Sequence, residues 1–212
     1  MKKLEKIFLT LALVFLVACQ GDQASSQSAL APMVRVGGET YVSTGYFNSM
    51  VTCGTASGQI SSSVPSSQEP QEDNQSNFGK GYDWQVWEEG YINVKIDDKW
   101  VLFQNIAMDN QSIPYGVAHF KGKVLEAEED QLLVQVTEID DAFFFYKKIF
   151  TKPLVLSIEN LKNAKDGQVT TEGLEGKEVE VWFDGQVSNY EEESSGPIEL
   201  GDIYKIDPVS RG

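Results

Sequence analysis

A single histidine, His119, and two cysteines, Cys19 and Cys53, are the residues of this chain whose types could support nucleophilic or metal chemistry. A histidine with Cys53 completes a typical zinc site only when carboxylates supply the remaining ligands. A serine-histidine-aspartate triad would need His119 as its base, but no serine stands in a G-x-S-x-G context, and neither H-E-x-x-H nor a phosphate-binding loop occurs. The sequence therefore predicts no catalytic residue, no metal site and no cofactor.

The element expected around His119 agrees with this interpretation. Polar and apolar residues alternate from His119 to Val124, which is the pattern of a half-buried strand. Alternation puts His119 on the polar side with Lys121 and Lys123, opposite Phe120 and Val124. We therefore expect His119 at the surface, where it is neither a ligand nor a general base.

Carboxylates dominate the charge of the chain. It carries 32 Asp and Glu against 17 Lys and Arg, a net charge of −15. This charge repels phosphates, so nucleic acid is not expected as a partner. The acidic runs at 97–98, 128–130 and 191–193 lack the spacing of an EF-hand and are typical of solvated turns. The abundance of acids leaves one catalytic alternative open, a carboxylate-dependent cell-envelope hydrolase.

Aromatic rings gather in two places. Four of them fall within ten residues and form our candidate binding surface, since such rings stack on sugars or protein partners: Tyr82, Trp84, Trp87 and Tyr91. The second group, residues 143–146 (FFFY), would put rings on both faces of a strand expected over 143–150. One face then belongs to the core, and the other is covered by a neighbouring domain or open to a partner.

Two hairpins are predicted in the first half of the chain. Two β-prone runs, 33–36 and 39–44, flank Gly37-Gly38, and glycine tolerates the positive φ that a tight hairpin turn requires. Residues 91–96 alternate cleanly, Asp97-Asp98 makes the turn, and 99–103 returns.

The second half continues with short runs of strand type: 120–125, 132–136, 143–150, 154–158, 178–183 and 202–206. No long helical period follows the N-terminal apolar stretch. We therefore predict a mainly β protein of two small antiparallel β-domains, 31–107 and 117–208, the second a compact barrel.

The N-terminus has the form of an export signal. Lys2, Lys3 and Lys6 precede an apolar stretch, Ile7 to Val17, which is too short to span a bilayer as a helix. The run Leu16-Val17-Ala18-Cys19 that ends it resembles the lipobox of bacterial lipoproteins.

That resemblance implies a signal peptide over 1–18 and a diacylglyceryl group, with acyl chains such as palmitate, on Cys19. The protein would then be lipid-anchored at the extracytoplasmic face of the cell membrane, with 19–30 as a flexible tether. Cys53 would have no disulfide partner, and we expect it to be buried as a small apolar residue.

Two further resemblances concern the body of the chain. Residues 33–103 resemble a module of small lipoproteins from Gram-positive bacteria, through the V-x-V-G-G-x-x-Y hairpin and the run Gln75-Ser76-Asn77-Phe78-Gly79. This resemblance implies that the polar segment 61–77 is an ordered loop rather than a linker. Neither this module nor the next carries a known activity.

Residues 118–207 resemble an OB-like domain of unknown function found in other lipoproteins. The residues that carry the likeness are 122–125 (GKVL), 176–185 (GKEVEVWFDG) and 201–206 (GDIYKI). The resemblance implies a five-stranded OB-like barrel. Together these features favour a membrane-anchored, non-catalytic binding module at the cell surface, whose partner is an envelope protein, a peptide or a polymer.

Replacement of Cys19 tests the anchoring hypothesis. Cys19→Ser should abolish both lipoprotein-type processing and membrane retention, because two or more acyl chains hold a protein stably where one does not. Cell fractionation and mass spectrometry of the N-terminus measure the two effects. Processed Cys19→Ser protein that still partitions with membranes would show that the lipobox interpretation is wrong.

Overall fold

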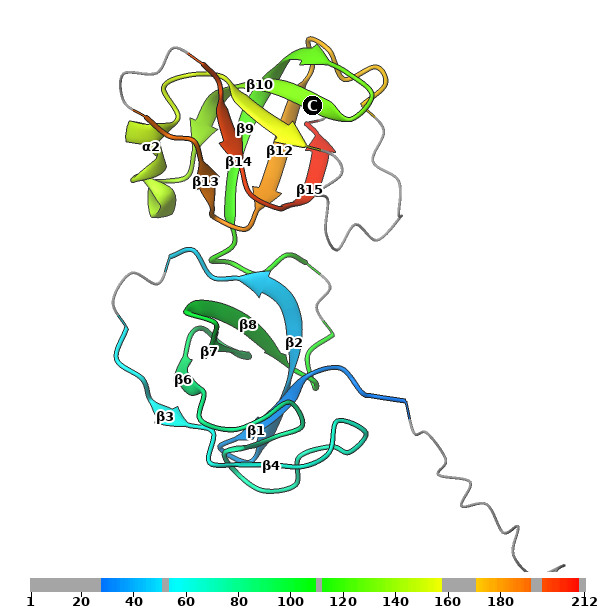
Figure 1. The fold of residues 1–212 in the computed structure, drawn as a ribbon, viewed down its shortest axis with the longest axis vertical. Coiled ribbons are helices and arrows are strands. Elements are labelled where there is room, and N and C mark those ends of the chain that lie inside the picture. Colours follow the sequence, from blue (N-terminus) through cyan, green and yellow to red (C-terminus); the bar gives the residue numbers. More distant parts are fainter. Residues whose placement is uncertain (1–27, 51–53, 110–111, 158–170, 192–195, 210–212) are drawn as a thin grey trace, which may run out of the picture.

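The computed structural model describes residues 28–50, 54–109, 112–157, 171–191 and 196–209. The signal segment, Cys19, Cys53 and most of the tether lie outside these ranges. Within them the protein is mainly β, which confirms that part of the predicted fold class, although each sheet includes one parallel pair of strands beside its antiparallel ones. Two sheets are present, one over residues 33–105 and one over 118–208, and they lie end to end along the molecule (Figure 1). No helix in the described part is long and apolar enough to cross a bilayer.

The N-terminal sheet has eight strands in the order β3-β6-β7-β8-β2-β1-β5-β4. Their bounds are β1 Met33–Val36, β2 Glu39–Phe47, β3 Gly58–Gln59, β4 Ser62–Ser63, β5 Gln75–Ser76, β6 Asp83–Val86, β7 Tyr91–Ile96 and β8 Lys99–Asn105. The sheet curls around its own apolar face (Figure 1). Val34, Val94 and Phe103 are fully buried inside it.

Both predicted hairpins are confirmed. β1 pairs with β2 in the register Val36↔Glu39, and Gly37 and Gly38 take φ values of 60° and 83°. β7 pairs with β8 in the register Ile96↔Lys99. Asp97 and Asp98 hold positive φ values of 48° and 63° in that turn, which aspartate tolerates better than most side chains.

The polar segment 61–77 is built into the N-terminal sheet. Its strand β5 pairs antiparallel with β1 and parallel with β4. Asn77 is only 3% exposed, and its side chain accepts a hydrogen bond from the Met33 N–H (2.7 Å) and donates one to the Ala31 carbonyl (2.9 Å). The segment is thus ordered by pairing its polar groups rather than by apolar burial.

The C-terminal sheet has seven strands in the order β13-β14-β11-β10-β9-β12-β15. Their bounds are β9 Ala118–Ala127, β10 Gln131–Ile139, β11 Leu154–Ser157, β12 Glu178–Phe183, β13 Val187–Ser188, β14 Ile198–Leu200 and β15 Ile203–Pro208. β14 pairs parallel with β11, whereas β15, two residues later, pairs antiparallel with β12. One stretch of chain therefore joins opposite ends of the β11-β10-β9-β12 run.

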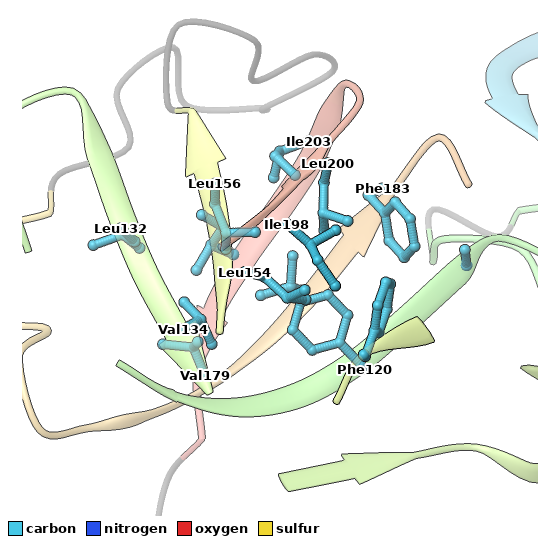
Figure 2. Close-up of a cluster of buried hydrophobic side chains, with 14 of the residues drawn as sticks. Phe120, Leu132, Val134, Leu154, Leu156, Val179, Phe183, Ile198, Leu200 and Ile203 are labelled. Carbon is cyan, nitrogen blue, oxygen red and sulfur yellow. The ribbon is translucent and has the colours of Figure 1, made fainter. Parts of the chain in front are cut away.

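Alternation along these strands fills the C-terminal core. Val179, Val181 and Phe183 of β12 are fully buried, while Glu178 and Glu180 point outward, as the sequence predicts. Figure 2 shows Phe183 and Phe120 facing the leucines and isoleucines of β11 and β14.

The prediction of a strand over 143–150 is wrong. This segment forms a 3-10 turn, η1 (Asp141–Phe143), followed by a short helix, α2 (Tyr146–Ile149). The side chain of Asp140 caps η1 by accepting the Ala142 N–H (2.8 Å). Phe143, Tyr146 and Phe150 then fall at spacings of three and four, so one helical side carries these rings into the core, with Tyr146 stacked on Phe150 at 4.9 Å.

The two sheets meet in a buried apolar cluster, here called the seam. Its fully buried members are Leu102 of β8, Val117 just before β9 and Tyr204 of β15. Around them pack partly buried residues from both sides: Tyr46, Phe47, Trp87, Ile113 and Trp182. Tyr46 meets Tyr204 edge to face at 4.9 Å. Neither sheet buries these residues alone, so the contact fixes one sheet against the other.

A tight turn at Asp184-Gly185 completes the seam. Gly185 has φ 78°, and a Cβ there would lie 2.2 Å from Ser49 Oγ of the N-terminal part. Gly185→Ala should therefore lower the free energy of unfolding by about 1–3 kcal/mol more than Gly176→Ala. Gly176 is a matched control, since its φ is 77° and a Cβ there meets nothing within 4 Å. Urea unfolding followed by tryptophan fluorescence measures both, and equal losses would mean that the seam tolerates the methyl group.

Asp184 itself is a buried charge in the seam, with its side chain 4% exposed and its Oδ2 3.8 Å from Lys99 Nζ. Burial raises the pKa of this carboxyl, and Lys99 opposes that rise without cancelling it. A raised folded-state pKa means that the group stabilises the fold fully below its ordinary pKa of 3.8 and loses this contribution as the pH rises through the folded-state value.

Asp184→Asn should therefore stabilise the protein at pH 8, by on the order of 1 kcal/mol, because the amide avoids the cost of burying a charge. The advantage should shrink as the pH falls toward 4. Urea unfolding at pH 4, 6 and 8 measures it, with Asp130→Asn as the control because Asp130 is exposed. A less stable Asp184→Asn protein at pH 8 would show that the attraction of Lys99 outweighs the cost of burial.

Candidate functional site

The four aromatic residues predicted as a binding surface are divided among different parts of the core. Tyr91 is 4% exposed and offers no surface. Tyr82 and Trp84 are half-buried against the N-terminal core, where Tyr82 contacts Phe78 (5.5 Å) and Trp84 Nε1 donates to Asn74 Oδ1 (2.8 Å). These rings therefore hold the 61–77 segment and the curled sheet together.

Trp87, the fourth ring, belongs to the seam. Its Nε1 donates a hydrogen bond to the Tyr115 carbonyl (3.0 Å), which links the chain just after β6 to the segment that connects the two sheets. Trp87 thus belongs to a different cluster from Tyr82 and Trp84. The four rings do not form one shared stacking face. The sequence shows four close rings but not which of them the sheet turns inward.

Several titratable side chains lie together in another part of the structure, in a hollow here called the His119 hollow. It has a volume of about 190 Å³ and lies on the outward side of β9, β10 and β12. Its polar lining residues are His119, Lys121, Glu138, Asp140 and Glu180. Strand register brings them together, because Glu180 and Glu138 both stand opposite Lys121 on neighbouring strands.

His119 forms an aromatic wall of this hollow. The alternation predicted for its strand is confirmed, but the ring is half-buried rather than free at the surface. It packs edge to face on Phe143 (5.2 Å) and stacks on Trp182 (6.2 Å), the residue opposite it on β12. Nδ1 lies 3.1 Å from the Val117 carbonyl. Because a carbonyl only accepts, Nδ1 carries the proton in the neutral ring and Nε2 remains an acceptor.

The charges of the hollow are mostly carboxylates. Lys121 Nζ contacts Glu138 Oε1 at 3.0 Å, and this hydrogen bond is the main reason why the pKa of Lys121 is raised. One carboxylate oxygen of Asp140 accepts the hydrogen bond that caps η1. The charge of Glu180 contributes further to the raised pKa of Lys121. Three carboxylates and one lysine leave the lining with a net negative charge.

Trp182 extends the aromatic wall toward β15. Lys205 Nζ lies 5.3 Å from the centre of the Trp182 ring, a cation–π contact, and also pairs with Asp207 at 2.5 Å. The outward side of β9, β12 and β15 is therefore a strip in which charged and aromatic side chains alternate.

The hydrolase alternative needs a carboxyl whose pKa is raised so that it can act as an acid. Burial raises the pKa of Asp184 and of Glu88, and neither lines the hollow. Asp184 sits in the seam, where its small exposed fraction leaves no access for a substrate. Within the described ranges, no group of three or more His, Cys, Asp or Glu side chains is placed to hold a metal ion.

A second hollow, of about 220 Å³, lies over β10 and β11. Its wall is largely apolar, from Leu132, Leu133 and Val155. Its polar residues are Glu126, Glu128 and Gln131, and a hydrogen bond of 2.6 Å joins the last two. It brings together fewer convergent polar groups than the His119 hollow, so we take the latter as the candidate site.

Comparison of the chain with protein-family models, curated proteins and solved structures finds no match. The class that the structure itself defines is a mainly β protein with two sheets joined by a buried seam. Any function must therefore be argued from the His119 hollow and from the residues that position it.

Proposed function

We propose that this protein is a non-catalytic binding module, anchored at the extracytoplasmic face of the cell membrane by a diacylglyceryl group on Cys19. Its partner would be an envelope protein, peptide or polymer. The observation that carries the proposal is the His119 hollow, in which acceptors of hydrogen bonds, charges and aromatic rings converge on one outward sheet face. Such a surface suits recognition, because its polar groups are fixed by contacts with one another.

We further propose that the C-terminal sheet is an OB-like barrel. Its five strands would be β9, β10, β11, β12 and the continuous β14–β15 segment, which touches both β11 and β12. Barrels of this kind bind ligands across one sheet face and its adjoining loops. The His119 hollow has a comparable location, since it spans three adjacent strands and the loop that leads to η1.

Two features support binding over hydrolysis. Glu138 is paired with Lys121, and Asp140 uses one of its two oxygens to cap η1, so neither carboxylate has both oxygens available for acid or base chemistry. The strongly negative charge of the chain further disfavours nucleic acid as the partner, although some OB-like barrels bind it.

The test uses the full-length protein purified in detergent and envelope fragments from cells that lack it. We expect saturable co-sedimentation of the protein with the fragments that exceeds its partition into liposomes made from the lipids of the same cells, and no release of soluble sugar or peptide. Release that disappears in Glu180→Gln would instead establish the hydrolase alternative. Co-sedimentation no greater than the partition into those liposomes would contradict the proposed function.

A further inference from the structure

The lining of the His119 hollow offers acceptors of hydrogen bonds rather than donors. Nε2 of His119 is an acceptor in the neutral form of the ring, because the Nδ1–H then donates to the Val117 carbonyl. Carboxylates of Glu180 and Asp140 add acceptor oxygens. The one lysine of the lining, Lys121, already contacts Glu138 at 3.0 Å. A ligand that complements this surface must therefore bring donors.

Charge narrows the class of ligand further. Three carboxylates against one lysine make the hollow negative, and the whole chain has a net charge of −15. The summed field therefore concentrates cations near the surface and repels anions. Phosphate-bearing or carboxylate-bearing ligands are disfavoured for this reason.

The lining favours an organic cation over a bare metal ion. Within the described residues, no group of three or more His, Cys, Asp or Glu side chains is placed to hold a metal ion. His119 instead gives the hollow one ring, which Trp182 stacks against from outside the hollow and so holds in place. A volume of about 190 Å³ suits the end of one alkylammonium or guanidinium side chain rather than a larger group.

We infer that the His119 hollow binds an organic cation, an alkylammonium or guanidinium group, between the carboxylates of Glu180 and Asp140 and the His119 ring. The inference rests on the proposed function, because it names the chemistry that the binding module recognises. A basic peptide and a free polyamine share this chemistry, and the experiment separates these two sources.

The single histidine of the chain provides a direct probe, since its ring gives one set of NMR signals. Full-length protein in detergent micelles is titrated with an acetyl-capped tetra-arginine peptide and, separately, with spermidine at matched ionic strength. We expect a saturable shift of the His119 ring signals. The tighter of the two ligands identifies the source, peptide or polyamine.

Two variants on one strand make the test specific. Glu180→Gln should weaken binding roughly fivefold, since a partly exposed charge pair contributes up to about 1 kcal/mol. Glu178→Gln should change it less than about twofold. Glu178 lies two residues before Glu180 on the same side of β12 but outside the hollow, and its carboxylate accepts a hydrogen bond from Thr137 Oγ1 (3.0 Å).

Three results would overturn the inference. Equal weakening by both variants would mean that the cation is attracted only by the overall charge. A neutral sugar such as chitotriose that shifts His119 at lower concentration than either cation would make the hollow a polyol site. No saturable shift with either cation would remove the site altogether. Envelope co-sedimentation would stand unaffected in that last case, so failure here is distinguishable from failure of the proposed function.

Discussion

The seam is the contact on which the rest of the structure depends. Val117 and Tyr204 are 1% exposed, so the two sheets exclude water between them. The seam also builds the candidate site: Val117 supplies the carbonyl that orients the His119 ring, and Trp182, which stacks on that ring, packs against the seam cluster. A change that loosened the contact between the sheets would therefore alter the hollow without touching any of its charged residues.

Much of the fold could be predicted from the sequence, because local chemistry decides it. Gly37-Gly38 and Asp97-Asp98 can take the backbone angles of a hairpin turn. The alternation of apolar and polar residues along β12 predicts which of its side chains are buried. The conformation of the segment after Asp140 could not be predicted in this way, because a run of consecutive aromatic residues is compatible with a strand and with a helix. Its conformation follows from the cap on η1 and from the packing of Phe150 on Phe120 and of Tyr146 on Phe183, which join it to distant strands of the C-terminal core.

The candidate site could likewise be predicted only in part from the sequence. The face that His119 occupies follows from alternation, but the acids around it come from β10 and β12, and only strand register sets them opposite Lys121. For Tyr82, Trp84, Trp87 and Tyr91 composition is uninformative, because a ring suits a core and a binding face alike. Asp184 illustrates a related point. Burial raises the pKa of its carboxyl, but this residue lies at the contact between the two sheets and not in the candidate site.

The parallel pairing of β14 with β11 has a consequence for how the chain folds. Leu154 meets Ile198 across a long stretch of intervening chain, so this contact must wait until the last strands have been synthesised. The N-terminal sheet also closes a long loop, through the pairing of Tyr41 with Asn105, but all its strands have been synthesised once the chain reaches Asn105. Closing long loops is slow relative to forming hairpins in both sheets. During synthesis the N-terminal sheet should therefore fold first, and Tyr204 then packs against Leu102 and Phe47 as the second sheet closes.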